Sequence, residues 1–229
     1  MRTRSVKILR LGTAGKLLAV SIAVLSLIGG GLFFLLPAQI SQEAIRSSVM
    51  QEPAVIERAW MLPVAATFNQ TVDWQSNASR CGPSSIANVF RSLGESKQTE
   101  SAVLAGTNWC WTGYCILGLT LDELAEIART YPNRRVTVLR DLTPEEFLDH
   151  LRNSNNPSRR YIINFSRAHI FGTGVGHHSP IGGYLESEDL VFVIDVNRNY
   201  QPWLVKRSRL FSAMNTFDGE VKRGLLLIE

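Results

Sequence analysis

The spacing of apolar positions changes near the middle of the chain, and this change predicts an α+β domain. Between Ile86 and Leu93, apolar residues recur at i, i+3, i+4 and i+7, which is one face of an α-helix. Pro83 suits the first turn of that helix and Gly94 suits its end. Cys81 therefore lies at or just before the N-terminus of a helix.

Two further helices are predicted by capping boxes, in which Thr120 precedes Glu123 and Thr143 precedes Glu146. Short apolar runs rich in β-branched and aromatic residues predict four strands. These runs are 136–139, 161–165, 190–194 and 225–228. Because helices dominate the first half and strands the second, we expect a helical lobe packed against a sheet.

Ahead of this domain, Leu17–Leu36 is a stretch of 20 residues without a charge that ends at Pro37. A helix of this length spans roughly 30 Å, the thickness of a bilayer core. A cleaved signal peptide has an apolar region of about 7–15 residues and a small-x-small cleavage site, which is not evident after Pro37. We therefore expect one transmembrane helix over 17–37, with a cleaved signal segment as the alternative.

The positive charge of the chain is concentrated in segment 1–16, which holds five basic residues and no acid. Without these five, the 24 lysines and arginines fall to 19, against 20 acidic residues. The rest of the chain is thus nearly neutral, which excludes nucleic acid as a partner. Because positive charge stays on the cytoplasmic side, segment 1–16 is a predicted cytoplasmic tail.

This orientation predicts where the folded part lies. The domain is expected in the periplasm or outside the cell, anchored to the inner membrane; signal cleavage would instead release it into the periplasm. Residues 38–60 are interpreted as a connector with a short amphipathic turn or two, and 61–229 as one domain. In such a compartment Cys110 and Cys115 are candidates for a disulfide, which leaves Cys81 unpaired.

An unpaired cysteine at a helix N-terminus is a candidate nucleophile, because the helix dipole and a nearby imidazole both favour the thiolate. Gly82 keeps the approach to the sulfur open, and Gln75 offers an amide donor for a developing oxyanion. The alternative is a buried structural thiol. Taken alone, the position of Cys81 does not decide between these interpretations.

Two adjacent histidines add to this hypothesis. His177 and His178 precede one predicted strand, and Asp195 follows Val193 and Ile194 on the next. A base on one strand and its carboxylate on the neighbouring strand give the base and third member of a catalytic triad. The histidine pair also invites a metal site with Cys81 or Asp195, but no second close ligand pair with metal-site spacing appears.

These residues resemble the phytochelatin synthase family, which consists of papain-like cysteine transferases. The resemblance runs over most of residues 68–227 and rests on six motifs in the right order. They are Gln75 six residues before Cys81-Gly82, 118–124, 163–167, 176–184, 195–203 (with Arg198, Tyr200, Pro202 and Trp203), and 213–218 with Arg223-Gly224. In this register His177 is the base, and His178 stands where the family usually has an apolar residue.

The resemblance implies a papain-like fold with an antiparallel sheet, and a reaction. Cys81 would attack the cysteinyl–glycine amide of glutathione, with Gln75 at the oxyanion, and His177 would protonate the departing glycine. A second glutathione would accept the γ-glutamylcysteinyl group to give a phytochelatin, or water would accept it. The chain ends soon after this domain, as in the short bacterial forms, without the cysteine-rich region of eukaryotic members.

The family also implies a substrate site and partners. Asp218 and Arg223 match the acid and base that bind the zwitterionic γ-glutamyl end, although their spacing is two residues shorter, and Arg198 supports the catalytic loop or touches substrate. No cofactor is needed for the chemistry. Heavy-metal ions such as Cd²⁺ or Zn²⁺ enter as glutathione thiolate complexes or activators, and a homodimer is left open.

Two other functions are weighed against this one. A papain-like peptidase would use the same triad on peptide substrates, and the Asp218 and Arg223 pair argues instead for a small zwitterion. A non-catalytic metal-binding module would use Cys81, the two other cysteines and the histidine pair. It would bind Zn²⁺ or Cd²⁺ stoichiometrically and cleave no amide.

Overall fold

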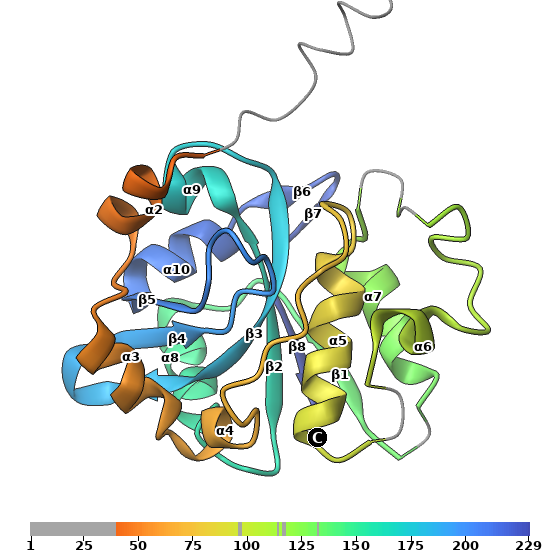
Figure 1. Ribbon diagram of the computed structural model, residues 1–229, viewed down its shortest axis with the longest axis horizontal. Helices are drawn as coiled ribbons and strands as arrows, with labels where there is room; N and C mark the ends of the chain where they lie inside the picture. Colours follow the sequence, from red (N-terminus) through yellow and green to blue (C-terminus); the bar gives the residue numbers. More distant parts are fainter. Residues whose placement is uncertain (1–39, 96–97, 114, 116–117, 132) are drawn as a thin grey trace, which may run out of the picture. The chain divides into compact units, whose positions relative to one another are not determined.

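Six antiparallel strands form the central sheet of the molecule, in the order β1-β8-β2-β3-β4-β5 (Figure 1). The computed structural model describes residues 40–229 except 96, 97, 114, 116, 117 and 132. The strands are β1 (Val136–Leu139), β2 (Arg160–Ser166), β3 (Gly176–Leu185), β4 (Leu190–Val193), β5 (Trp203–Lys206) and β8 (Leu225–Ile228), and a small hairpin pairs β6 (Phe217–Asp218) with β7 (Val221–Lys222). The four strands predicted from the apolar runs are confirmed within one residue at each end.

The helices belong to both faces of this sheet. They are α2 (Gln42–Ser48), α3 (Pro53–Trp60), α4 (Pro63–Ala66), α5 (Cys81–Ser92), α6 (Glu100–Leu104), α7 (Leu121–Arg129), α8 (Pro144–Asn153), α9 (Arg167–Phe171) and α10 (Arg207–Met214), with a 3₁₀ turn η1 (Glu186–Glu188). Figure 1 shows α5 and α7 together on one side and α8 and α10 on the other. The expected α+β arrangement with an antiparallel sheet is confirmed.

Two hydrophobic cores follow from the alternation of side chains along the strands. Ile162 of β2 and Phe192 of β4 pack with the helices around α5 and α7. Their sequence neighbours Tyr161 and Val193 pack on the opposite face, in the core that includes residues of α8 and α10. Because neighbouring residues of one strand enter different cores, the strands are apolar along both faces.

The helix predicted to begin at Cys81 is present, and its residues from Cys81 to Phe90 are all buried. Ile86, Val89 and Phe90 are fully buried against the sheet, and the helix ends at Ser92, just before Gly94 with its positive φ of 73°. The capping boxes at Thr120 and Thr143 are both present and begin α7 and α8. Local sequence signals therefore fixed where these helices start.

The segment interpreted as a connector, 38–60, contributes α2 and α3 to the folded unit. Ile45 of α2 is fully buried in the second core, and Ala59 of α3 is fully buried in the first. Met50 exchanges two backbone hydrogen bonds with Leu204 of the edge strand β5, at 2.8 and 2.9 Å. These contacts place the start of the folded unit near Ile40.

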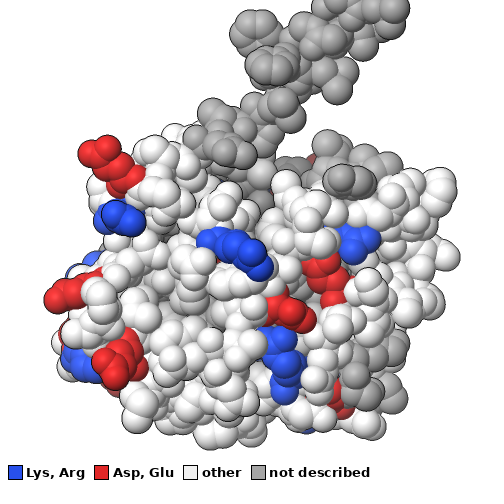
Figure 2. Space-filling view, in the orientation of Figure 1, with Lys and Arg blue, Asp and Glu red and all other residues white. Residues whose placement is uncertain are grey.

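The expected transmembrane helix over 17–37 lies outside the described residues. Within residues 40–229, less the gaps given above, no helix combines the length and the apolar character that crossing a bilayer requires. Figure 2 shows acidic and basic side chains interspersed on the visible face, without a large patch of one sign. This face fits the near balance of charge outside segment 1–16.

Candidate active site

Cys81 is the first residue of α5, and it is almost completely buried at the N-terminus of this helix. Residues four apart on a helix share a face, so Cys81 and Ser85 both point to β3. The Ser85 hydroxyl donates to the carbonyl of His178 at 3.1 Å, and Cys81 Sγ lies 3.8 Å from Nδ1 of the same residue. These contacts thus join the helix to the sheet at Cys81.

The two adjacent histidines begin β3 and pair with different residues of β2, His177 with Phe165 and His178 with Asn164. Because successive side chains of a strand alternate, the two imidazoles have different surroundings. His177 packs edge-on against the Phe165 ring, with centroids 5.6 Å apart. His178 is the imidazole for which the structure gives a direct sulfur contact.

The carboxylate of Asp195 is fully buried and accepts hydrogen bonds from four groups. Nε2 of His177 lies 3.0 Å from Oδ1, and the backbone N–H of Asn197 donates to the same oxygen at 2.9 Å. Nη2 of Arg167 donates to both oxygens at 3.0 and 3.1 Å, and the indole of Trp203 donates to Oδ2 at 3.1 Å. The arrangement fixes the carboxylate and, through it, the orientation of His177.

The charges of this cluster favour a thiolate facing an imidazolium. Burial raises the pKa of the Cys81 thiol, but the charge and hydrogen bonding of His177, followed by those of His178, hold this pKa well below its ordinary value. Burial and Arg167 lower the pKa of His177, yet Asp195 and Cys81 raise it above its usual value. Burial raises the pKa of Asp195, whereas Arg167 and His177 hold it well below its usual range. Asp195 is therefore ionised at neutral pH.

Gln75 and Arg198 line a cavity of about 500 Å³ together with Asn77, Asn197 and neighbouring residues. The backbone N–H of Gln75 donates to the carbonyl of Val196, so the segment before α5 is tied to the loop that follows Asp195. The Gln75 amide nitrogen donates to the carbonyl of Asn77 at 2.8 Å. Its Oε1 is buried and has no hydrogen-bond partner among the described residues.

Asp218 and Arg223 lie together beside the start of β3, joined by an ion pair of 2.8 Å. The side chain of Asn164 bridges them, donating to Asp218 at 2.9 Å and accepting from Arg223 at 3.1 Å. A Cβ on Gly176 would lie 2.7 Å from Nη1 of Arg223, so the guanidinium passes directly over the residue before His177. Hence the pair expected to bind the γ-glutamyl end is adjacent to the expected base.

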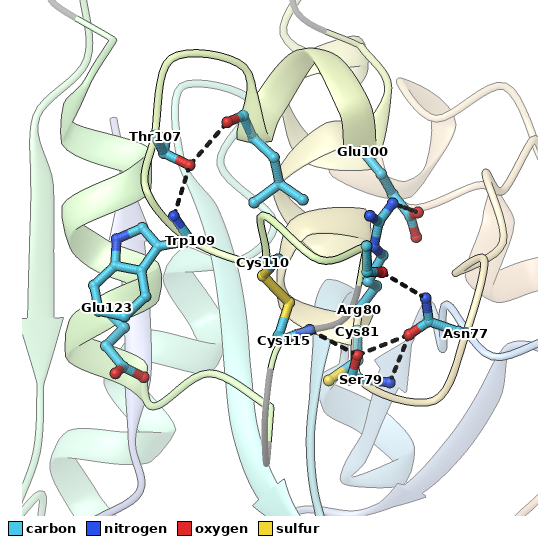
Figure 3. Close-up of a disulfide and its surroundings, with 12 residues drawn as sticks. Asn77, Ser79, Arg80, Cys81, Glu100, Thr107, Trp109, Cys110, Cys115 and Glu123 are labelled. Carbon is cyan, nitrogen blue, oxygen red and sulfur yellow. Dashed lines mark hydrogen bonds and ion pairs between the residues drawn. A yellow bond between two sulfur atoms is a disulfide. The ribbon is translucent and has the colours of Figure 1, made fainter.

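The segment that carries Cys81 is braced by the loop of the Cys110–Cys115 disulfide, which the structure confirms (Figure 3). The backbone N–H of Cys115 donates to the hydroxyl of Ser79 at 3.0 Å. The Asn77 amide donates to the carbonyl of Gly113 at 3.2 Å. Because Cys110 and Cys115 are bonded to each other, they do not supply thiolates to the metal-binding module considered above. Within the described residues, no three histidines, cysteines or acids cluster as metal ligands.

Arg167 and Asn164 are among the residues of the site that had no role assigned from the sequence. Both lie in the motif 163–167 that carries part of the family resemblance. The available signal was a polar residue inside an apolar strand and a cation just after it. Buried polar groups of this kind need specific partners, but the sequence does not say which.

This fold and this cluster are typical of papain-like cysteine enzymes, with a cysteine at a helix N-terminus and a histidine–carboxylate pair on the adjoining sheet. The chain belongs to the phytochelatin synthase family, whose model matches residues 37–225. In the solved structures, a protein described as a C39-like peptidase from Bacillus anthracis shares this fold, with a TM-score of 0.52 and 12% identity over 71% of this chain and 95% of that chain.

Two curated relatives carry the name glutathione gamma-glutamylcysteinyltransferase. The protein numbered 3 under this name, from Lotus japonicus, is 34% identical over 119 residues, which cover 49% of this chain and 25% of the relative. The protein of Schizosaccharomyces pombe is 26% identical over 172 residues, which cover 68% of this chain and 41% of the relative. The chain thus spans between a quarter and about two fifths of the length of these relatives.

Proposed function

We propose that this chain cleaves the cysteinyl–glycine amide of glutathione through a γ-glutamylcysteinyl thioester on Cys81. The observation that carries this proposal is the low-pKa thiol at the start of α5, beside a histidine that a buried aspartate holds. Membership of the phytochelatin synthase family and the names of the curated relatives support glutathione as the substrate.

In the first half-reaction the Cys81 thiolate attacks the amide carbonyl, and the electron pair moves onto oxygen. Collapse of this intermediate breaks the C–N bond, and the His177 imidazolium gives its proton to the departing glycine amine. In the second half-reaction His177 takes a proton from the α-amino group of another glutathione, or from water, as this acceptor attacks the thioester carbonyl. The C–S bond then breaks and the Cys81 thiolate is released. The products are a phytochelatin dimer in the first case and γ-glutamylcysteine in the second.

The oxyanion of each half-reaction needs donors close to the sulfur. The backbone N–H groups at the start of α5 lie at the positive end of the helix dipole, and Gln75 is the proposed side-chain donor. The amide nitrogen of Gln75 already donates to Asn77, so this role requires that bond to be exchanged for one to substrate. Asp195 keeps His177 oriented throughout.

The proposed site for the γ-glutamyl end is the pair of Asp218 and Arg223. An acid and a base side by side match the α-amino and α-carboxylate groups of that end. Asp218 retains 27% exposure of its side chain, whereas Arg223 is 9% exposed and its buried Nε has no hydrogen-bond partner among the described residues. Arg198, in the cavity beside Gln75, is proposed to touch substrate or support the catalytic loop.

The test is incubation of the detergent-solubilised full-length chain with glutathione, with and without Cd²⁺, followed by mass spectrometry. Cys81→Ala is the matched control. Glycine with γ-glutamylcysteine alone would identify a hydrolase, and an additional (γ-Glu-Cys)₂-Gly product would identify a synthase. Intact glutathione in every condition with folded protein would reject the proposal, and a peptide-cleavage screen would then test the peptidase function.

We also propose that segment 17–37 anchors the domain to the inner membrane, with the domain in the periplasm or outside the cell. The support is the uncharged stretch behind a basic segment. Membrane fractionation with protease accessibility tests it: a protected domain would reverse the orientation, and a protein shortened at about residue 37 would indicate signal cleavage. The incubations with and without Cd²⁺ test whether activity depends on heavy-metal ions. Light scattering tests whether the chain forms a homodimer.

A further inference from the structure

The second histidine of the pair has an environment that the proposed mechanism does not use. His178 is 2% exposed, and its Nδ1 lies 3.8 Å from Sγ of Cys81. Its other ring nitrogen, Nε2, is also buried and finds no hydrogen-bond partner among the described residues. The backbone of His178 is held to α5 by the hydroxyl of Ser85. The imidazole is therefore fixed against the nucleophile, with the sulfur as the hydrogen-bond partner of its ring.

The tautomer of the His178 imidazole follows from its partners. With a proton on Nδ1, the ring donates to the thiolate, and only an acceptor is left unpaired at Nε2. With a proton on Nε2 alone, a buried N–H would be left unpaired and the thiolate would lose a donor. Of the two tautomers, the one with its proton on Nδ1 is therefore favoured.

We infer that His178 is a second imidazole for the nucleophile, an N–H donor that holds the Cys81 thiolate while His177 carries the catalytic proton. The inference rests on the proposed function only in taking Cys81 as the nucleophile.

The two imidazoles then have separate tasks. His177 is connected to Asp195, which is connected in turn to Arg167, so its proton is available for acid–base chemistry. His178 has no carboxylate partner among the described residues, so it stabilises the anion without serving as the base. The groups that act on the thiol are these two rings on β3 and the N-terminus of α5 that carries it.

The test is the pH dependence of alkylation of Cys81 by iodoacetamide in the detergent-solubilised full-length chain, without glutathione. Cys81 is suitable because the other two cysteines form the disulfide. His178→Phe removes the donor and retains a ring of similar shape, whereas His178→Asn keeps an N–H near the position of Nδ1. For His178→Phe we expect the titration midpoint to rise by about one pH unit, the size expected for a lost hydrogen bond to a charged group.

A second result separates this role from a structural one. A thiolate that is less stabilised is more nucleophilic, so the plateau rate of His178→Phe at high pH should rise about threefold. Disturbed packing would lower that plateau instead. His178→Asn should restore the wild-type midpoint and plateau. If His178→Phe does not fold, by circular dichroism, His178→Leu takes its place.

An unchanged midpoint in a folded His178→Phe or His178→Leu variant would overturn the inference. Complete loss of glutathione turnover in both His178→Phe and His178→Asn would also overturn it, because His178 would then be the base. If the titration midpoint shifts as expected but the wild-type chain does not turn over glutathione, glutathione is rejected as the substrate and the inference on His178 stands. The two proposals thus fail in distinguishable ways.

Discussion

Nε2 of His177 lies 3.0 Å from Oδ1 of Asp195, and both side chains are almost completely buried. Since this contact occupies Nε2, Nδ1 is the ring nitrogen that the proposed mechanism would use for proton exchange with the thiol. Asp195 also accepts from Arg167, Trp203 and the backbone of Asn197, so the carboxylate has little freedom to turn. Asp195 and the groups that hold its carboxylate therefore set the orientation of the His177 ring.

Replacing Asp195 by Asn should narrow the pH range of activity. In the proposed mechanism, activity needs the thiolate and the imidazolium together, so it rises with pH through the low pKa of Cys81 and falls through the raised pKa of His177. Removing the carboxylate charge lowers the pKa of His177, which moves the alkaline limb down by about one pH unit or more. The measurement is kcat/KM for glutathione against pH. Asp149→Asn, at a position with 72% side-chain exposure, is the control and should leave the limb in place.

Replacing Arg167 by Gln should move the alkaline limb of the pH profile to higher pH. The Arg167 charge lowers the pKa of His177, so its removal raises that pKa and extends activity to higher pH. The variant should also lose about 3 kcal/mol of unfolding free energy, because a buried ion pair is broken. Urea unfolding and the pH profile measure the two effects. Arg167→Lys keeps the charge and should therefore leave the alkaline limb in place. An equal shift of this limb in Arg167→Lys and Arg167→Gln would contradict this explanation.

Gly176→Ala should weaken glutathione binding through Arg223. The added Cβ would lie 2.7 Å from Nη1 of that arginine and must displace the guanidinium. A loss of about 1.4 kcal/mol of binding corresponds to a tenfold higher KM, with kcat changed much less. The comparison that decides is a double-mutant cycle with Arg223→Ala. If Gly176→Ala costs as much in that background as alone, its effect does not pass through Arg223.

Opening the Cys110–Cys115 disulfide should destabilise the domain moderately. Replacing both cysteines by Ser removes a short covalent loop, which costs about 2 kcal/mol of unfolding free energy in the chain-entropy model. The wild-type chain in reductant should show the same loss in urea unfolding, and the double variant should not respond to reductant. Equal stability of all four samples would show that the bridge contributes little.

Much of the fold followed from local signals. The helix beginning at Cys81, the two threonine capping boxes and the four apolar strands were predicted with accurate bounds, because capping and periodicity act within a few residues. Residues 42–60 were harder to assign, since what makes them part of the unit is the burial of Ile45 and the pairing of Met50 with Leu204, which lie far apart in sequence.

The sequence by itself determined the chemistry available to this protein: a cysteine at a helix start, and a histidine pair and an aspartate near two neighbouring strands, in the order of the phytochelatin synthase family. Tertiary structure alone decided how these groups are connected. It placed Arg167 on Asp195, Arg223 over Gly176 and His178 against Cys81, because only packing of helix on sheet brings distant side chains within hydrogen-bond distance. Adjacent residues of a strand face opposite ways, and so two neighbouring histidines received different partners.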